Sequence, residues 1–184
     1  MTMEDGGGQL TIPVGEHDHT EGPASAPVTL VEYGDYECPY CGAAYPIVKE
    51  IQQRLGERLR FVFRNFPITT AHPHAEHAAE AAEAAGAQGK FWEMHDYLYE
   101  HQHVLPDRKL EEYAAAVGLD VERFDRDMEG QAYRERVRSD FMSGVRSGVN
   151  GTPSFFINGR RHNGSYDLET LLAAIEAAMP ETVR

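Results

Sequence analysis

The two cysteines of the chain, Cys38 and Cys41, are separated by a proline and a tyrosine. They follow an apolar strand pattern and precede a helical one, so Pro39 falls at the first position of a helix, where its missing N–H costs nothing. Residues at i and i+3 of a helix have Cβ atoms about 5–6 Å apart, which a disulfide can bridge with modest adjustment. The spacing therefore predicts a redox-active pair.

Cys38 is predicted to be the nucleophile of this pair. The free N–H groups and the positive end of the helix dipole lie beside its sulfur and stabilise a thiolate, which is the reactive form. The carboxylates of Asp35 and Glu37 oppose that charge. Cys41 lies inside the helix, is better shielded, and is predicted to act as the resolving thiol.

Two other interpretations of the cysteines remain open. They can be buried structural thiols, or they can form half of a zinc site. Zinc needs two further ligands, and the chain has no second Cys-x-x-Cys motif. Histidines that could supply them are His72, His74, His77 and His162. Such histidines are more often cap, core or surface residues than metal ligands, so we predict no metal.

The elements that must position the cysteines begin with a strand, a helix and a strand. Residues 28–33 form a β-branched and apolar run. Apolar positions then recur at helical spacing from 44 to 55, and residues 59–66 alternate as a second strand. The linking helix predicts a right-handed parallel unit, with the cysteines at its first strand-to-helix turn.

The rest of the chain predicts a helical insertion and a second half of the sheet domain. Residues 71–147 carry helical patterns without strand patterns. Residues 154–157 read as a strand, Asn158-Gly159 is a preferred hairpin turn, and a helix follows with Asp167 as its N-cap. The predicted fold is α/β, with βαβ and ββα halves at 27–70 and 148–184. The all-helical domain at 71–147 lies between them, and residues 1–26 are an N-terminal arm.

Four segments together carry a resemblance to a known family. They are VEYGDYECPYC at 31–41, NFP at 65–67, QGKFWEMH at 88–95 and GTPSFFING at 151–159. Over residues 27–179 the chain closely resembles DsbA-type thiol:disulfide oxidoreductases of the thioredoxin superfamily. The resemblance implies a thioredoxin-like fold with a helical insertion after its second strand. It also implies protein thiol or disulfide clients, a redox partner and no cofactor.

The resemblance also implies roles for individual residues. Cys38 attacks, Cys41 resolves, and Glu32 is the buried acid that takes the Cys41 proton as that sulfur attacks the mixed disulfide. A strand-edge carboxylate in water, or a structural ion pair with a nearby arginine, is the alternative interpretation of Glu32. Pro153 is a cis proline facing the cysteines, and the Thr152 hydroxyl can donate to the Cys38 thiolate. We expect the pKa of Cys38 to lie between the ordinary ~8.5 and the ~3.5 of DsbA itself. The predicted client-binding residues are Pro39, Tyr40, Thr152 and Pro153.

The Pro-Tyr dipeptide between the cysteines is the one usual in glutaredoxins, which keeps two other functions open. One is a glutaredoxin- or peroxidase-like reductase of small disulfides or peroxides. The other is a non-catalytic thioredoxin-fold module that senses oxidation through Cys38 and Cys41. The direction of exchange is not fixed by the sequence.

Composition excludes several partners of the chain. It has 184 residues, with 17 Lys and Arg against 30 Asp and Glu, for a net charge of −13. A field of that sign repels nucleic acid and anionic lipid, and no apolar run approaches the ~18 residues of a membrane helix. Residues 1–10 lack the pattern of a secretory signal. We therefore expect a cytoplasmic monomer, although an exported form without its signal would have the same sequence.

Overall fold

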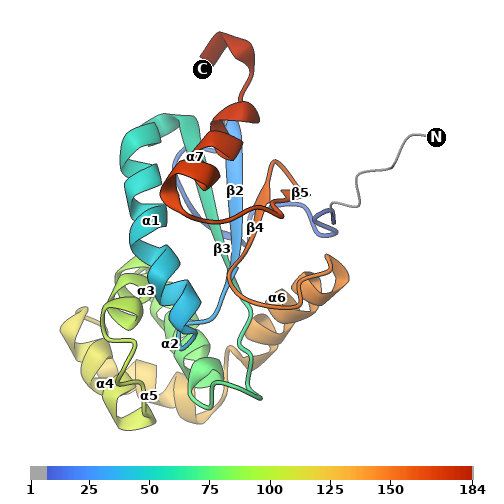
Figure 1. Cartoon of the computed structure of the whole chain (residues 1–184). Coiled ribbons are helices and arrows are strands. Elements are labelled where there is room, and N and C mark those ends of the chain that lie inside the picture. The colour runs from blue at the N-terminus through green and yellow to red at the C-terminus, as the bar shows by residue number, and fades with distance from the viewer. Residues whose placement is uncertain (1–7, 184) are drawn as a thin grey trace.

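The computed structural model describes residues 8–183, and its centre is a five-stranded mixed sheet (Figure 1). The strand order is β1-β3-β2-β4-β5. β2 and β3 are parallel, and the other neighbouring strands are antiparallel. The strands are β1 (His19–Glu21), β2 (Val28–Gly34), β3 (Leu59–Asn65), β4 (Ser154–Ile157) and β5 (Arg160–Arg161).

Helices α1 and α7 lie side by side over one face of this sheet, and the other five gather beyond the carboxyl ends of β2 and β3 (Figure 1). The five, α2 to α6, form an insertion between β3 and β4. The helices are α1 (Pro39–Leu55), α2 (Ala75–Ala87), α3 (Phe91–Glu100), α4 (Asp107–Ala116), α5 (Val121–Glu129), α6 (Arg134–Arg146) and α7 (Leu168–Ala177). Short 3₁₀ turns are η1 (Gly56–Arg58) and η2 (Glu181–Val183). The predicted α/β order of elements is confirmed.

Side-chain alternation along β2 divides the core into two parts. Leu30 faces α1 and α7, whereas Val31 and Tyr33 face the opposite side, where Phe66 and Phe141 stack. Successive side chains of a strand point to opposite faces. Glu32 has the same parity as Leu30, so its carboxyl group is directed toward the α1 side.

Helix α1 starts where the sequence predicts. Cys38 is its extended N-cap and Pro39 its first residue, and the helix ends at Gly56, whose φ is +54°. Cys41 and Ala44 begin its buried stripe, which continues at i+3 and i+4 spacing. At the other end of the chain, the Asp167 carboxylate accepts the Thr170 N–H, which is the predicted cap of α7.

The assignment of residues 1–26 to an arm needs correction. Residues 19–21 form β1, which pairs with β3 at the edge of the sheet. The Gly8 carbonyl accepts the Arg161 N–H, and the Leu10 N–H donates to the Gly159 carbonyl. Residues 8–10 therefore lie alongside β5. His-Thr-Glu carries no apolar alternation, which is why an edge strand of three polar residues escaped prediction. Residues 1–7 of the predicted arm lie outside the described residues.

Candidate active site

Cys38 and Cys41 lie in the first turn of α1, both as reduced thiols. The Cys41 thiol hydrogen-bonds the Cys38 sulfur. Cys41 is fully buried, and Cys38 is buried except for 3% of its surface. The Cys38 thiol lies 3.5 Å from the Thr152 carbonyl oxygen, its acceptor across the site.

The surroundings of Cys38 lower its pKa from 9.0 to about 5. The hydrogen bond from the Cys41 thiol is the largest cause, and bonds from the Thr152 side chain and from the backbone N–H groups of Cys41 and Tyr40 add to it, against the effect of burial. Those N–H groups are free because they belong to the first turn of α1. Cys38 is therefore a thiolate at neutral pH. Its pKa lies within the interval expected from the sequence.

The Thr152 hydroxyl is poised for that thiolate. It is buried and has no hydrogen-bond partner within residues 8–183 while Cys38 carries its proton. Once the sulfur is charged, the hydroxyl can donate to it, and this bond is one of the causes of the low pKa of Cys38.

Cys41 has the opposite environment. Burial is the largest cause that raises its pKa well above 9.0, and its hydrogen bond to Cys38 and the charge of Glu32 add to the shift. The backbone N–H of Asp35 donates to its sulfur at 3.5 Å and opposes the shift weakly. Cys41 keeps its proton at neutral pH and must lose it before it can attack.

Glu32 lies in the interior of the same site. It is 3% exposed, and no group in the described part of the chain hydrogen-bonds its Oε1. Burial, followed by the charge of Cys38, raises its pKa to about 8. Because the Glu32 charge also raises the pKa of Cys41, the two groups share one electrostatic environment. A carboxyl group with this pKa can hold or release a proton near neutrality.

The predicted client-binding residues surround the Cys38 sulfur. Pro39 and Tyr40 are exposed on one side of it, with Tyr40 66% exposed. Thr152 and Pro153 lie on the other side, half-buried, at the start of β4, and the peptide bond between them is cis. Polar backbone and an exposed aromatic ring thus flank the nucleophile.

A family model described as thioredoxin matches residues 15–177. The chain belongs to the thioredoxin family. Its structure is similar to that of oxidised BdbD from Bacillus subtilis, with a TM-score of 0.80 and 24% identity over 94% of this chain and 96% of that one. A thioredoxin-like oxidoreductase from Silicibacter pomeroyi matches with a TM-score of 0.74 and 29% identity, over 88% and 91% of the two chains.

One curated relative is named as an ion transporter. It is a Na⁺/H⁺ antiporter NhaA 1 of Salinispora arenicola, 48% identical over 94% of this chain but only 26% of its own length. This thioredoxin-family chain thus spans about a quarter of the length of such curated relatives. None of the helices within residues 8–183 combines the length and the apolarity needed to cross a bilayer.

Asp35 has a part in this thioredoxin-family site that the sequence did not indicate. The sequence presented it as a charge opposing the thiolate, but its carboxylate accepts the backbone N–H groups of Glu37 (2.8 Å), Cys38 (3.2 Å) and Ile68 (2.8 Å). His72 Nδ1 lies 2.8 Å from the same carboxylate. Asp35 therefore ties the loop before α1 to the segment after β3. An Asp side chain bonding the N–H two residues ahead is a local turn signature that could have revealed this role.

The histidines considered as zinc ligands are directed at other groups. His72 faces Asp35, His74 lies 3.3 Å from Glu37, and His77 lies 2.7 Å from Asp107. The fourth candidate, His162, lies 2.8 Å from the Ser165 carbonyl. No group of three or more His, Cys, Asp or Glu side chains that could hold a metal ion occurs in the described residues.

Gln102, just after α3, holds the active-site turn from the insertion side. Its amide donates to the carbonyls of Tyr36 (3.0 Å) and Cys38 (2.6 Å). Gly42 leaves room for it, since a Cβ there would lie 2.1 Å from Gln102 Oε1. No motif marks Gln102, because its partners are more than 60 residues away in the sequence.

Proposed function

We propose that this chain exchanges disulfides with protein thiols through Cys38 and Cys41, and that it oxidises its clients. The observation that carries the proposal is the stabilised Cys38 thiolate beside a buried, protonated Cys41. A thiolate of low pKa is a good leaving group, and stabilising the reduced form makes the corresponding disulfide a stronger oxidant. The likeness to oxidised BdbD and to a thioredoxin-like oxidoreductase supports the same chemistry.

The first step starts from the Cys38–Cys41 disulfide. A client thiolate attacks the Cys38 sulfur, a client–Cys38 bond forms, and the Cys38–Cys41 bond breaks. The electron pair goes to the Cys41 sulfur, which takes a proton from Glu32. Glu32 can supply it because burial keeps its pKa near 8, and it regains a proton from water.

The second step releases the oxidised client. Another client thiolate attacks the client sulfur of the mixed disulfide, and Cys38 leaves as the thiolate that its surroundings stabilise. The client loses two electrons and two protons and gains a disulfide. The protein returns to its reduced form, with Cys41 as a thiol and Cys38 as the thiolate that its lowered pKa favours, and the remaining proton is released to water.

Client binding is proposed for the residues around Cys38. An extended segment can pair with the backbone of Thr152 by strand addition, while Pro39 and exposed Tyr40 contact its side chains.

The Pro-Tyr dipeptide favours a second candidate function, the reduction of small disulfides or peroxides. Ion transport is not proposed, because the thiol pair supports exchange and the match covers only a quarter of the antiporters.

Turnover of a protein client tests the proposal. Unfolded, reduced ribonuclease should regain activity faster with oxidised glutathione and a catalytic amount of this protein than with oxidised glutathione alone. Cys38→Ser should abolish the acceleration, and Cys41→Ser should accumulate a mixed disulfide through Cys38, identified by mass spectrometry. Turnover of small disulfides but not of ribonuclease would select the second candidate. Reversible oxidation without any turnover would select the redox-sensing module.

The cytoplasmic location and the monomeric state stay predictions from the sequence. Fractionation of source cells with an antibody tests the first, and sedimentation velocity of the purified chain tests the second. A disulfide donor acts most effectively outside reducing compartments, so an exported pool would agree with the proposed direction of exchange and contradict the predicted location.

A further inference from the structure

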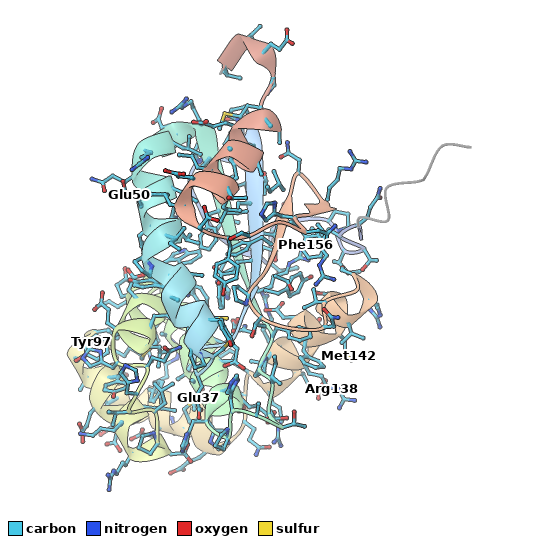
Figure 2. All side chains as sticks on the ribbon, in the orientation of Figure 1. Glu37, Glu50, Tyr97, Arg138, Met142 and Phe156 are labelled. Atoms are coloured by element: carbon cyan, nitrogen blue, oxygen red, sulfur yellow. The ribbon has the colours of Figure 1, made fainter. Side chains whose placement is uncertain are left out.

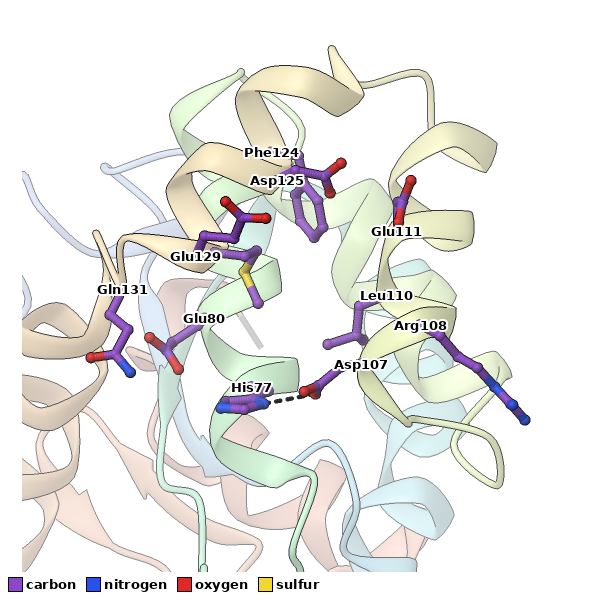
Figure 3. Close-up of a pocket in the computed structure, with 11 residues that line it drawn as sticks. His77, Glu80, Asp107, Arg108, Leu110, Glu111, Phe124, Asp125, Glu129 and Gln131 are labelled. Atoms are coloured by element: carbon purple, nitrogen blue, oxygen red, sulfur yellow. Dashed lines mark hydrogen bonds and ion pairs between the residues drawn. The ribbon is translucent and has the colours of Figure 1, made fainter.

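A cavity of about 410 Å³ lies within the helical insertion, between α2, α4 and α5 (Figure 3). This volume is within the ~300–1,000 Å³ typical of ligand pockets. Its apolar side is formed by Leu110, Phe124 and Met128. Acidic residues supply most of its charge, and they are Glu80, Asp107, Glu111, Asp125 and Glu129. We call this cavity the acidic pocket.

Glu80 is the unusual member of the acidic pocket. Only 3% of its surface is exposed, yet none of the described residues hydrogen-bonds its Oε1. A buried carboxylate oxygen without a donor is unfavourable. Burial is the largest cause that raises the pKa of Glu80, and the charges of Glu76 and Asp107 add to it. Glu80 is therefore a buried acid whose Oε1 lacks a hydrogen-bond donor among the described residues.

The basic residues of the acidic pocket do not supply that donor. His77 Nδ1 lies 2.7 Å from Asp107 Oδ1, so His77 is paired with Asp107 rather than with Glu80 (Figure 3). The guanidinium of Arg108 points away from Glu80 in the same view. The charges of His77 and Arg134 act on the pKa of Glu80 in the lowering direction, but burial outweighs them.

We propose that the acidic pocket binds an arginine or lysine side chain of a protein client. This inference rests on the proposed exchange with protein thiols. Arg and Lys carry long methylene stems that pack on apolar surface while the charged end finds polar partners, which matches an apolar wall of Leu110, Phe124 and Met128 beside Glu80. A cationic donor to a carboxylate makes a charge-assisted hydrogen bond, about twice as strong as a neutral one.

The place of the acidic pocket along α2 connects it to the thiols. Glu37 lies near the start of α1 (Figure 2) and adjoins Cys38 in the sequence. Its carboxylate accepts the His74 N–H, at the start of α2, at 2.7 Å. Glu80 follows six residues later, about 9 Å along the helix axis at 1.5 Å per residue. An extended client rises about 3.3 Å per residue. About 9 Å takes about three extended residues, and the stretch from Cys38 to the start of α2 adds a few more, so the inference places the basic residue about four to six positions from the reacting cysteine.

Calorimetric titration separates this inference from thiol chemistry. The protein is the Cys38→Ser/Cys41→Ser variant, and the probe is an acetylated, amidated peptide of alternating Ser and Ala with an alanine at the client-cysteine position and arginine five residues away. The matched peptide has norleucine in place of arginine. The arginine peptide should bind at least tenfold more tightly. Glu80→Gln should remove that difference, whereas Glu122→Gln, an exposed acid on α5 outside the pocket, should leave it intact.

Two further measurements decide between outcomes. Glu111→Gln, at the exposed rim, should weaken arginine-peptide binding two- to fivefold, which keeps the test valid if Glu80→Gln unfolds by circular dichroism. With oxidised glutathione as the terminal oxidant, the unsubstituted protein should convert cysteine-containing versions of both peptides into disulfide-linked peptide dimers, with a higher kcat/KM for the arginine peptide. Equal binding of arginine and norleucine peptides, or equal effects of Glu80→Gln and Glu122→Gln, would overturn the inference. Binding as expected without oxidation of either peptide would instead contradict the proposed function.

Discussion

The chemistry at the residue scale follows from the different environments of two identical thiols. Cys38 gains hydrogen bonds to its charged form, from the Cys41 thiol first, and its pKa falls to about 5. Cys41 loses contact with water, and its pKa rises. The sequence could predict this asymmetry because a cysteine before an N1 proline lies at a helix N-terminus. It could not give the size of the shift, which depends on Thr152, more than 100 residues away.

Replacing Thr152 tests its part in stabilising the thiolate. Thr152→Val keeps the shape of the side chain and removes the donor, so the pKa of Cys38 should rise by about one unit, the value of one hydrogen bond to a charged group. The rate of iodoacetamide alkylation against pH gives this pKa. Ser154→Ala is the control, because the Ser154 hydroxyl donates to the Gly151 carbonyl in the same loop. An equal shift in both variants would assign the effect to loop structure.

Glu32 affects both the opening of the Cys38–Cys41 disulfide and the stability of the fold. Its pKa is raised from 4.5 to about 8, so the folded protein binds more protons than the unfolded chain between these values. This group therefore makes the free energy of unfolding fall as pH rises from 4.5 to 8. Glu32→Gln removes this fall in the free energy of unfolding, because the glutamine side chain does not titrate. Relative to the unsubstituted protein, the variant should gain stability with pH, by at most about 5 kcal/mol at pH 8.5 for a shift of about 3.5 units.

Urea denaturation of the reduced proteins at pH 5 and pH 8.5 measures this difference. Glu57→Gln, an exposed acid, is the control and should show no pH-dependent gain. The Glu32→Gln variant should also slow the attack of a client thiolate on the Cys38–Cys41 disulfide, because Cys41 then leaves without its proton donor, while the departure of Cys38 in the second step should be unaffected. A stability difference that does not change with pH, together with an unchanged rate of disulfide opening by the client thiolate, would leave Glu32 a structural residue.

At the element scale, the start of α1 is held from several sides. Asp35 bonds it to the segment after β3, and Gln102 bonds it to the end of α3. Hydrophobic periodicity predicts α1, α3, α4, α6 and α7, whereas α2 is predicted from the helix propensity of its alanines and is buried nearly all round. Periodicity could not predict β1, whose three residues are polar, or Gln102, whose contacts are set by tertiary packing alone.

Gly42→Ala tests the contact between Gln102 and the active-site turn. Alanine in place of glycine ordinarily stabilises a helix interior by about 0.5–1 kcal/mol. Here the new Cβ would lie 2.1 Å from Gln102 Oε1 and displace an amide that makes two hydrogen bonds. The variant should instead be about 1–3 kcal/mol less stable by urea denaturation. In the Gln102→Ala background, the same substitution should be neutral or stabilising, and destabilisation in both backgrounds would refute the contact.

The whole molecule combines a mixed sheet that positions the thiols with a helical insertion that contacts them. The insertion reaches the active-site turn through Gln102, and its first helix begins beside Glu37. The domain order was predictable, since strand patterns stop after 66 and return at 154. The acidic pocket was not, because Glu80 and Phe124 become neighbours only when α2 and α5 pack together.

The reduction potential of the Cys38–Cys41 pair tests the central claim most directly. Thioredoxin combines a thiol pKa of about 7 with about −270 mV, and DsbA combines about 3.5 with about −120 mV. Interpolation to a Cys38 pKa of about 5 gives roughly −180 mV. Equilibration with glutathione buffers, followed by mass spectrometry of the alkylated protein, measures it. A potential near −180 mV is the predicted result. Failure to form the disulfide, or a potential at or below about −270 mV, would contradict an oxidase that works through the Cys38 thiolate.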